Sequence, residues 1–386
     1  MNNTITSQRI DDAVRRTEPF LIEARRHFHR YPELSRQEHE TAAYIRKYLE
    51  EWDIPYDVND VGNTVAVFGG RGGNGNRTIA LRGDIDALPV QEETGCEYAS
   101  CHEGIMHACG HDCHGAMMLG AAKILKELEP YIPGRVKVIF QEAEETGEGA
   151  LKLMESHLLD DVNRIVGLHV TQEEDLGTFQ LGYGIMSAIG RGARMTFTRG
   201  NVRDQILAAT DCMDLLREQA LRQFPANHRT VLVPTVIRTI PEKSVELTCN
   251  FRTLEPEDEI TFEHIIEYAV TQASSNNCVN GSWVSTGRDE GVMNDKSSTD
   301  LAIRVIEQTF GKAAVTIRRP YISGEDFAYY QKKIPGVMIH IGGAVNGEYL
   351  PLHTSKTMVD EKVLAIGVSF LMRYVFAYFD VDLPGV

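Results

Sequence analysis

The chain has 386 residues, of which 42% are hydrophobic, and its formal net charge is −16. This length suggests two or three domains, and the hydrophobic content is enough for sizeable cores. The acidic balance argues against nucleic acid or an anionic membrane as a partner, because both select clustered lysine and arginine.

The first half of the chain alternates predicted helices and strands. Helical periodicity covers 11–30, and the residues 35–38 fit a capping box that opens a second helix ending near Trp52. A glycine-rich turn is expected at 69–76. Apolar runs predict a helix at 115–129 and strands at 63–68, 78–82, 135–140, 165–170 and 178–182. This alternation predicts an α/β sheet with helices on both faces.

The pattern changes in the middle of the chain, where the predicted order is βαββαβ. The strands are expected at 193–198, 230–240, 244–253 and 283–286, and the helices at 202–222 and 257–273. This order is typical of a small ferredoxin-like sandwich. Helix–strand alternation returns from about residue 294, so we expect a domain at 189–293 inserted into a larger α/β domain of 1–188 and 294–386.

The composition also bears on the compartment. Seven cysteines, an odd number spread along the chain, argue against a disulfide framework and favour reduced thiols in the cytoplasm. The first 20 residues are polar and charged and lack the apolar core of a signal peptide. The apolar stretch 363–379 contains Arg373, so we expect a buried terminal helix there rather than a membrane span.

The segment 106–114 concentrates cysteine and histidine on a loop rich in small residues. Cys109 and His111 are two positions apart, so both side chains can face one point if the loop is extended. A Cys109 thiolate could also bridge two metal ions. The alternative is that Cys109 is a buried thiol and that His111 starts a helix. The acidic pair and the two further histidines downstream favour the metal site.

Glu144 and Glu145 directly follow a predicted strand, and His169 and His353 lie beside strand or turn signals. In an extended segment, neighbouring side chains point to opposite sides, so one glutamate can bind metal while the other faces the substrate. The alternative is a solvated acidic loop. The preceding strand favours a site, because α/β proteins bind ligands at strand carboxyl ends.

Such a centre suits amide hydrolysis. A bound zinc or manganese ion lowers the pKa of its water from ~16 towards ~7 and polarises a carbonyl. A carboxylate base then takes a proton from the water and returns one to the leaving amine. Asp86 and Asp112 would each orient a histidine through its other ring nitrogen, unless they only cap turns.

Taken together, these segments resemble the metallopeptidase superfamily of aminoacylases and glutamate carboxypeptidases. Within it, the chain is similar to the amidohydrolase branch, which includes hippurate hydrolases, indole-acetyl-amino-acid hydrolases and N-acetyl-diaminopimelate deacetylases. The resemblance spans nearly the whole chain. It is carried by the segments 29–35, 81–89, 106–114, 140–145, 167–170, 324–330 and 352–354.

The resemblance implies a catalytic domain with a mixed sheet and an inserted ferredoxin-like lid that mediates homodimerisation. Glu144 would be the general base, Asp86 the carboxylate behind the metal ligands, and Arg252 a lid residue that holds a substrate carboxylate. Two divalent ions, zinc or manganese with cobalt also possible, would be held by Cys109, His111, Glu145, His169 and His353.

The expected function is therefore metal-dependent hydrolysis of the amide bond in N-acyl amino acids or similar small amides. The alternatives are a dipeptidase of the same superfamily and a non-catalytic relative that binds metal or ligand. Two departures from the family pattern stand out. Glu142 replaces a proline, and the segment 198–203 lacks the family's lid histidine. Either Arg199, Asn201, Arg203 or His228 takes the role of that histidine, or the substrate is unusual.

Overall fold

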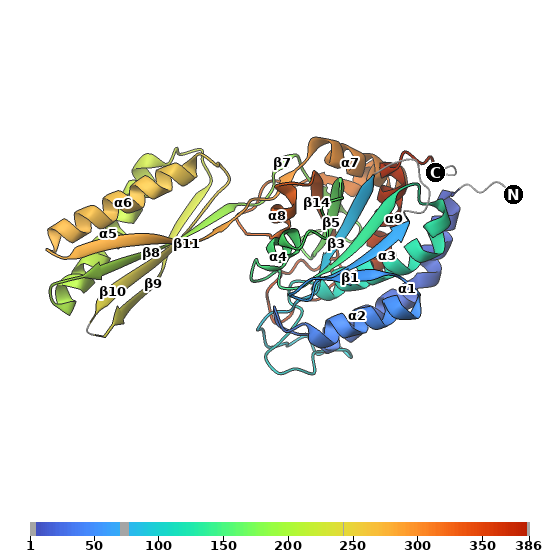
Figure 1. Cartoon of the computed structure of the whole chain (residues 1–386), viewed down its shortest axis with the longest axis horizontal. Coiled ribbons are helices and arrows are strands. Elements are labelled where there is room, and N and C mark those ends of the chain that lie inside the picture. Colours follow the sequence, from blue (N-terminus) through green and yellow to red (C-terminus); the bar gives the residue numbers. More distant parts are fainter. Residues whose placement is uncertain (1–4, 70–76, 242, 384–386) are drawn as a thin grey trace. The chain divides into compact units, whose positions relative to one another are not determined.

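The computed structural model describes residues 5–69, 77–241 and 243–383, so the predicted glycine-rich turn lies, except for Gly69, outside the described residues. The chain forms two compact units (Figure 1). Unit 1 comprises Met1–Gly184, Met293–Arg319 and Asp326–Val386, and unit 2 comprises Ile185–Val292 and Pro320–Glu325. In the last of these segments, Tyr321 N–H donates to the Met186 carbonyl at 3.0 Å, which joins the segment to the start of unit 2.

Unit 1 is built on a mixed sheet of eight strands in the order β1-β2-β4-β3-β5-β14-β6-β13. Its four central strands, β4, β3, β5 and β14, run parallel to one another. The register places Leu81 of β3 beside Val138 of β4 and Val166 of β5. The strands are β1 (Tyr56–Val58), β2 (Thr64–Gly69), β3 (Thr78–Asp84), β4 (Arg135–Gln141), β5 (Arg164–Thr171), β6 (Phe179–Leu181), β13 (Val315–Ile317) and β14 (Gly336–Gly342).

Helices cover this sheet, and α1, α3 and α9 pack on one another over its core (Figure 1). The apolar segment around Arg373 forms the buried terminal helix α9, as predicted. Within the described ranges, no helix combines the length and hydropathy that a bilayer crossing requires. The helices are α1 (Ser7–Arg30), α2 (His39–Glu51), α3 (His111–Leu128), α4 (Gly149–Glu155), α7 (Lys296–Phe310), α8 (Phe327–Gln331) and α9 (Lys362–Tyr378), with 3₁₀ turns at Glu129–Tyr131 and Lys312–Ala314.

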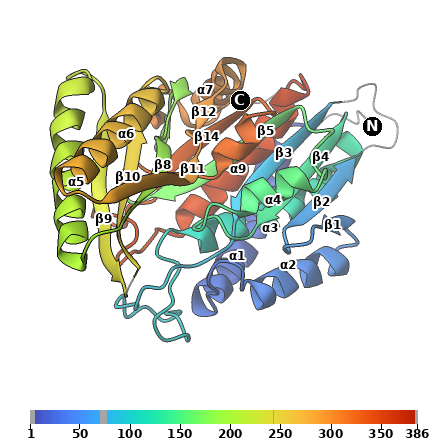
Figure 2. The ribbon, with the colours of Figure 1, turned by 60° about the vertical axis from the view of Figure 1, so that its left-hand side comes forward.

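Unit 2 is a ferredoxin-like βαββαβ domain. Its four antiparallel strands have the order β11-β8-β10-β9, and both helices cover one face of the sheet (Figure 2). Its elements are β8 (Ile189–Thr198), α5 (Val202–Gln223), β9 (Thr230–Ile240), β10 (Ser244–Thr253), α6 (Asp258–Asn276) and β11 (Asn280–Asp289). The short strands β7 (Gly184–Ile185) and β12 (Met293–Asn294) lie where the chain passes between the units.

Two of the side chains considered as substitutes for the lid histidine have structural partners in unit 2. The Asn201 side chain accepts a hydrogen bond from Asp204 N–H and caps α5. His228 lies with Nδ1 2.9 Å from the Asp258 carboxylate. Both side chains therefore contribute to the stability of the domain itself.

The predicted capping box at 35–38 is wrong. The helix α2 begins at His39, and the Glu38 side chain makes no cap hydrogen bond. Instead, the Glu33 carboxylate accepts from the backbone N–H groups of Glu40 and Thr41 at 3.2 and 2.8 Å. The Ser35 hydroxyl donates to Asp86 at 2.7 Å. A distant carboxylate thus competes successfully for the hydroxyl that the local pattern assigns to the helix end.

Candidate metal centre

The parallel strands bring several of the predicted site residues to one edge of the sheet. Asp86 follows the end of β3, and Glu144 and Glu145 follow the end of β4. His169 lies two residues before the end of β5. Because β4, β3 and β5 are parallel neighbours, their carboxyl ends meet at the same edge. Side chains that are far apart in sequence can therefore converge there.

Two groups of ligand atoms share the Cys109 sulfur. The first group joins Cys109, His111 and His169, and the second joins Cys109, Glu145 and His353. Cys109 Sγ lies 3.5 Å from His169 Nε2 and 3.1 Å from His353 Nε2. Glu145 Oε1 lies 3.7 Å from His353 Nε2 and 3.9 Å from His111 Nε2. All five predicted metal ligands thus lie together, around a common thiol.

These atoms fit divalent ions. Zinc bonds of about 2.0–2.3 Å place two ligands of one tetrahedral ion about 3.3–3.6 Å apart, close to the separations at this centre. His111 Nε2 and Glu145 Oε1 are buried and have no hydrogen-bond partner. Burial also raises the pKa of the Cys109 thiol well above its usual range, so its thiolate needs a cation beside it. Buried groups in this state are costly unless a bound ion satisfies them.

Asp86 orients His111 from behind. Its carboxylate lies 3.0 Å from His111 Nδ1, which leaves Nε2 directed at the cluster. The same carboxylate accepts from Ser35 Oγ at 2.7 Å and from the Glu145 backbone N–H at 3.0 Å. Burial opposes ionisation of Asp86, but the hydrogen bond with His111 lowers its pKa. One carboxylate therefore positions two of the candidate ligands.

The loop around Cys109 is not extended, and the predicted helix begins earlier than expected. His111 is the first residue of α3, and Gly110 before it has a left-handed φ of 85°. A Cβ atom at Gly110 would lie 2.3 Å from Val170 Cγ2, so only glycine fits. This tight turn, rather than an extended loop, brings Cys109 and His111 to one centre.

The acidic pair is also not extended. Glu144 and Glu145 lie in a turn that follows Ala143, whose φ is 56°. Their carboxylates do not point to opposite sides, because an oxygen of each lies within 4.8 Å of the other and of His111 Nε2 or Nδ1. Asp326 N–H donates to Glu144 Oε1 at 3.3 Å. The turn therefore holds both carboxylates at the same cluster.

His353 reaches the cluster from the loop before α9. Its backbone N–H donates to the Ala108 carbonyl at 2.8 Å, next to Cys109. Its own φ is 63°, and its side chain is 55% exposed. This is the most exposed of the five candidate ligands, so this side of the cluster opens to solvent.

A buried pair that the sequence did not single out supports His169. His114 Nδ1 is hydrogen-bonded to the Asp84 carboxylate, and His114 Nε2 accepts from Val170 N–H at 2.8 Å. The Val170 carbonyl in turn lies 2.7 Å from His169 Nδ1, which leaves His169 Nε2 for an ion. His114 is one residue before the expected start of its helix at residue 115, so no periodic signal marked it.

Asp112 does orient a histidine, but one outside the expected centre. Its carboxylate lies 2.8 Å from His29 Nδ1 and 2.7 Å from Arg25 Nε, and all three side chains are buried. The pairing ties the first turn of α3 to α1.

Arg252 lies in unit 2, on β10, in the wall of a cavity of about 190 Å³ that Asn250, Thr286 and Asp289 also line. Its Nη2 lies 3.6 Å from Asp289 Oδ2, and its Nη1 is buried without a hydrogen-bond partner. A guanidinium with an unsatisfied donor is well suited to bind an anionic group.

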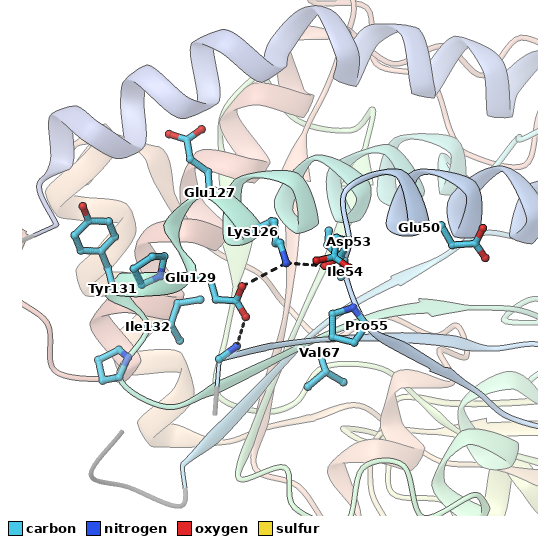
Figure 3. A pocket seen from close by; sticks show the side chains of 13 residues that line it. Glu50, Asp53, Ile54, Pro55, Val67, Lys126, Glu127, Glu129, Tyr131 and Ile132 are labelled. Carbon is cyan, nitrogen blue, oxygen red and sulfur yellow. Dashed lines mark hydrogen bonds and ion pairs between the residues drawn. The ribbon is translucent and has the colours of Figure 1, made fainter. Parts of the chain in front are cut away.

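A larger cavity of about 1220 Å³ lies in unit 1 between the ends of α2 and α3 (Figure 3). None of the eight predicted site residues lines it. Lys126 in its wall donates to the Asp53 carbonyl at 2.6 Å and pairs with Glu129 at 3.7 Å. The Lys126 ammonium group thus bonds to groups in the cavity wall. The larger volume of this cavity does not make it the functional site, because the predicted site residues lie elsewhere.

Known proteins resemble this chain along almost its whole length. It is 35% identical over 370 residues to N-acetyl-L-cysteine deacetylase from Bacillus subtilis, which covers 91% of this chain and 86% of the relative. IAA-amino acid hydrolase ILR1-like 5 from Arabidopsis thaliana is 33% identical over 386 residues, with 93% and 86% covered. Thermostable carboxypeptidase 1 from Saccharolobus solfataricus is 30% identical over 384 residues, with 93% and 95% covered.

A solved structure also resembles this chain along almost its whole length. The crystal structure of the YXEP protein of Bacillus subtilis, described as a dinuclear metal-binding peptidase of family M20, has a TM-score of 0.82 and 28% identity. The match covers 95% of this chain and 100% of that protein. Residues 80–377 match the peptidase family M20/M25/M40 directly. The chain therefore belongs to the peptidase family M20/M25/M40.

Proposed function

We propose that the chain hydrolyses the amide bond of N-acyl amino acids at the Cys109 cluster, with Glu144 as general base. The family match and the named relatives show that this chain carries out metal-dependent amide hydrolysis. The observation that supports the cluster is the convergence of Cys109, His111 and Glu145 with two further histidines around unsatisfied buried atoms.

Cys109, His111, Glu145, His169 and His353 would hold two divalent ions, with Cys109 in both groups of ligands. One ion would take His111 or His169 with the thiolate, and the other would take Glu145 and His353. Bound ions polarise the scissile carbonyl and make water acidic enough to attack near neutral pH. Thiolate and imidazole ligands suit zinc, whereas the carboxylates also admit manganese or cobalt.

Glu144 is proposed to move the protons. A carboxylate oxygen of Glu144 lies within 4.8 Å of an oxygen of Glu145 and of a ring nitrogen of His111. Glu144 also accepts a hydrogen bond from Asp326 N–H. In this position it can remove a proton from the attacking water and later donate one to the leaving amine. Asp86 keeps His111 in the tautomer that leaves Nε2 free to bind an ion.

The proposed substrates are small molecules in which an acyl group is joined to an amino acid. The related proteins are named for N-acetyl-L-cysteine and for IAA-amino acid conjugates, which share this linkage. A peptide substrate is the second candidate, because another relative is named a carboxypeptidase. The third candidate is a non-catalytic relative that binds metal or ligand. The presence of Glu144 beside Glu145 argues against it, because a protein without turnover does not need a general base in addition to its metal ligands.

The first experiment is a substrate panel. The purified chain is stripped with a chelator and assayed for free amine on N-acetyl and N-benzoyl amino acids and on dipeptides. We expect turnover to disappear on chelation and to return with zinc, manganese or cobalt, highest on the N-acyl amino acids. Higher rates on dipeptides would favour the peptidase. If every member stays intact while bound metal is confirmed, the proposed reaction is wrong.

We also propose that Arg252 binds the carboxylate of the substrate. Its unsatisfied Nη1 would gain a charge-assisted hydrogen bond, which contributes roughly 1.5–3 kcal/mol. In Arg252→Ala we therefore expect KM for an N-acyl amino acid to rise ~10- to 100-fold, with a smaller change in kcat. The same substrate with its carboxylate capped as an amide is the control. Equal KM changes for both substrates would refute this role.

Unit 2 is proposed to act as a lid and to form a homodimer. Its edge strand β9 pairs only with β10 among the described strands, and Val231, Val233 and Val236 on it are 40–47% exposed. An open apolar edge of this kind favours pairing with a second copy. Light scattering should give twice the mass of one chain, and Val233→Lys with Val236→Lys should give a monomer. A monomeric unmodified protein would contradict the dimer.

The cytoplasm is the proposed location. All seven cysteines lie in the described residues, and all are free thiols, as expected for a reducing compartment. The acidic net charge of −16 supports small-molecule partners rather than nucleic acid or membrane.

A further inference from the structure

A second group of metal-binding side chains lies outside the Cys109 cluster. His29 near the end of α1 meets Glu92 and Cys96 from the long loop between β3 and α3. One ligand atom from each of these three residues lies within 4.8 Å of the others. We call these three residues the outer cluster.

The separations within the outer cluster suit one ion. Glu92 Oε1 lies 3.3 Å from His29 Nε2 and 3.7 Å from Cys96 Sγ. Ligands of one tetrahedral zinc ion lie about 3.3–3.6 Å apart, as follows from its bond lengths. Glu92 Oε1 is thus close to this spacing from both other residues, and the ligand atoms of His29 and Cys96 lie within 4.8 Å of each other.

The outer cluster also has the supporting contacts of a metal site. Asp112 lies 2.8 Å from His29 Nδ1, which repeats the arrangement of Asp86 and His111 at the Cys109 cluster. The second oxygen of Glu92 accepts from Ser100 N–H at 2.7 Å. A carboxylate behind the histidine and a held ligand carboxylate are typical of protein metal sites.

Charge and burial favour a cation there. The side chains of His29 and Glu92 are 1% and 4% exposed, whereas Cys96 is only half-buried and leaves a path from solvent. His29 lies between two carboxylates, with Asp112 2.8 Å from its Nδ1 and Glu92 3.3 Å from its Nε2. Asp112 also pairs with the Arg25 guanidinium, so the Glu92 carboxylate and the Cys96 thiolate would be the negative groups that hold a cation at the outer cluster.

We propose that His29 Nε2, Glu92 and Cys96 Sγ form a third metal site, selective for zinc and separate from the catalytic pair. Thiolate and imidazole together favour zinc over the hard ions magnesium and calcium. Three protein ligands leave the fourth position of the ion open to water. The ion would fasten the loop that carries Glu92 and Cys96 to α1.

The site is tested by a difference in zinc content. The full chain and its Cys96→Ser variant are stripped, saturated with zinc, passed over a desalting column and measured for metal. We expect the unmodified chain to retain one more zinc per chain than the variant, with the affinity for that ion at least ~10- to 100-fold lower in the variant, the range seen when supporting partners alone are lost. Because the quantity is a difference, it stands whether or not the catalytic pair is as proposed.

Two control variants distinguish zinc bound at the outer cluster from zinc bound nonspecifically to other thiols. Cys101→Ser removes an exposed thiol five positions along the same loop and should keep the extra ion. Glu92→Gln should lose it while circular dichroism shows an unchanged fold. Hydrolysis by Cys96→Ser should stay at the unmodified rate. Equal zinc contents in the unmodified chain and in Cys96→Ser would overturn the proposal, as would loss of the ion in Cys101→Ser alone.

Discussion

Replacing Glu144 with glutamine is expected to lower kcat by ~10²- to 10⁴-fold, the contribution that a positioned general base makes. Glutamine has the same shape and can still accept from Asp326 N–H, but it cannot take a proton from water. Because Glu145 remains to bind metal, the ions and the fold should be kept. Steady-state kinetics with the best substrate of the panel, together with metal analysis, measures both quantities.

Glu148→Gln is the matched control for this variant. Glu148 comes directly after the same turn, at the N-cap of α4, and its half-exposed carboxylate pairs with Arg36 at 3.4 Å. The same chemical change there should leave kcat within about twofold, because surface ion pairs contribute little. A rate close to that of the unmodified protein in Glu144→Gln would remove Glu144 from the role of base. Loss of metal in that variant would instead make it a ligand.

The second large effect is expected from Cys109→Ala. If the thiol is shared between two ions, its removal weakens both sites at once, so the Cys109 cluster should lose one or both of its two ions while the ion of the outer cluster stays. Turnover should fall with it, because it depends on the ions. Metal analysis after gel filtration and titration of the stripped protein with zinc measure the loss.

Cys113→Ala separates ligation from packing. Cys113 lies four positions after Cys109, in α3, and its thiol is fully buried. Its loss should cost on the order of 1 kcal/mol of stability, as an ordinary core substitution does, without loss of metal. Full metal content in Cys109→Ala would exclude Cys109 from the ligand set. An equal metal loss in both variants would point to disturbed packing instead.

The local patterns predicted most of the elements of this chain. The strands β9 and β10 run over the expected residues, and the order βαββαβ produced the ferredoxin-like unit. Periodicity succeeds here because a strand or helix is formed mainly by residues close together in sequence. The pattern around Ser35 misled because a hydroxyl can bond either to its own helix or to Asp86.

The family of this protein, and the residue types and order of its candidate metal ligands, could be read from the amino-acid sequence alone. Which of these atoms lie together depends on how the distant segments pack. The support of His169 on β5 comes from Asp84 on β3 and His114 on α3, which are neighbours only in the folded protein. The outer cluster likewise joins His29 on α1 to Glu92, which lies 63 positions further along the chain. A buried polar group takes its partner from whichever strand or loop packs beside it, and no short stretch of sequence contains that information.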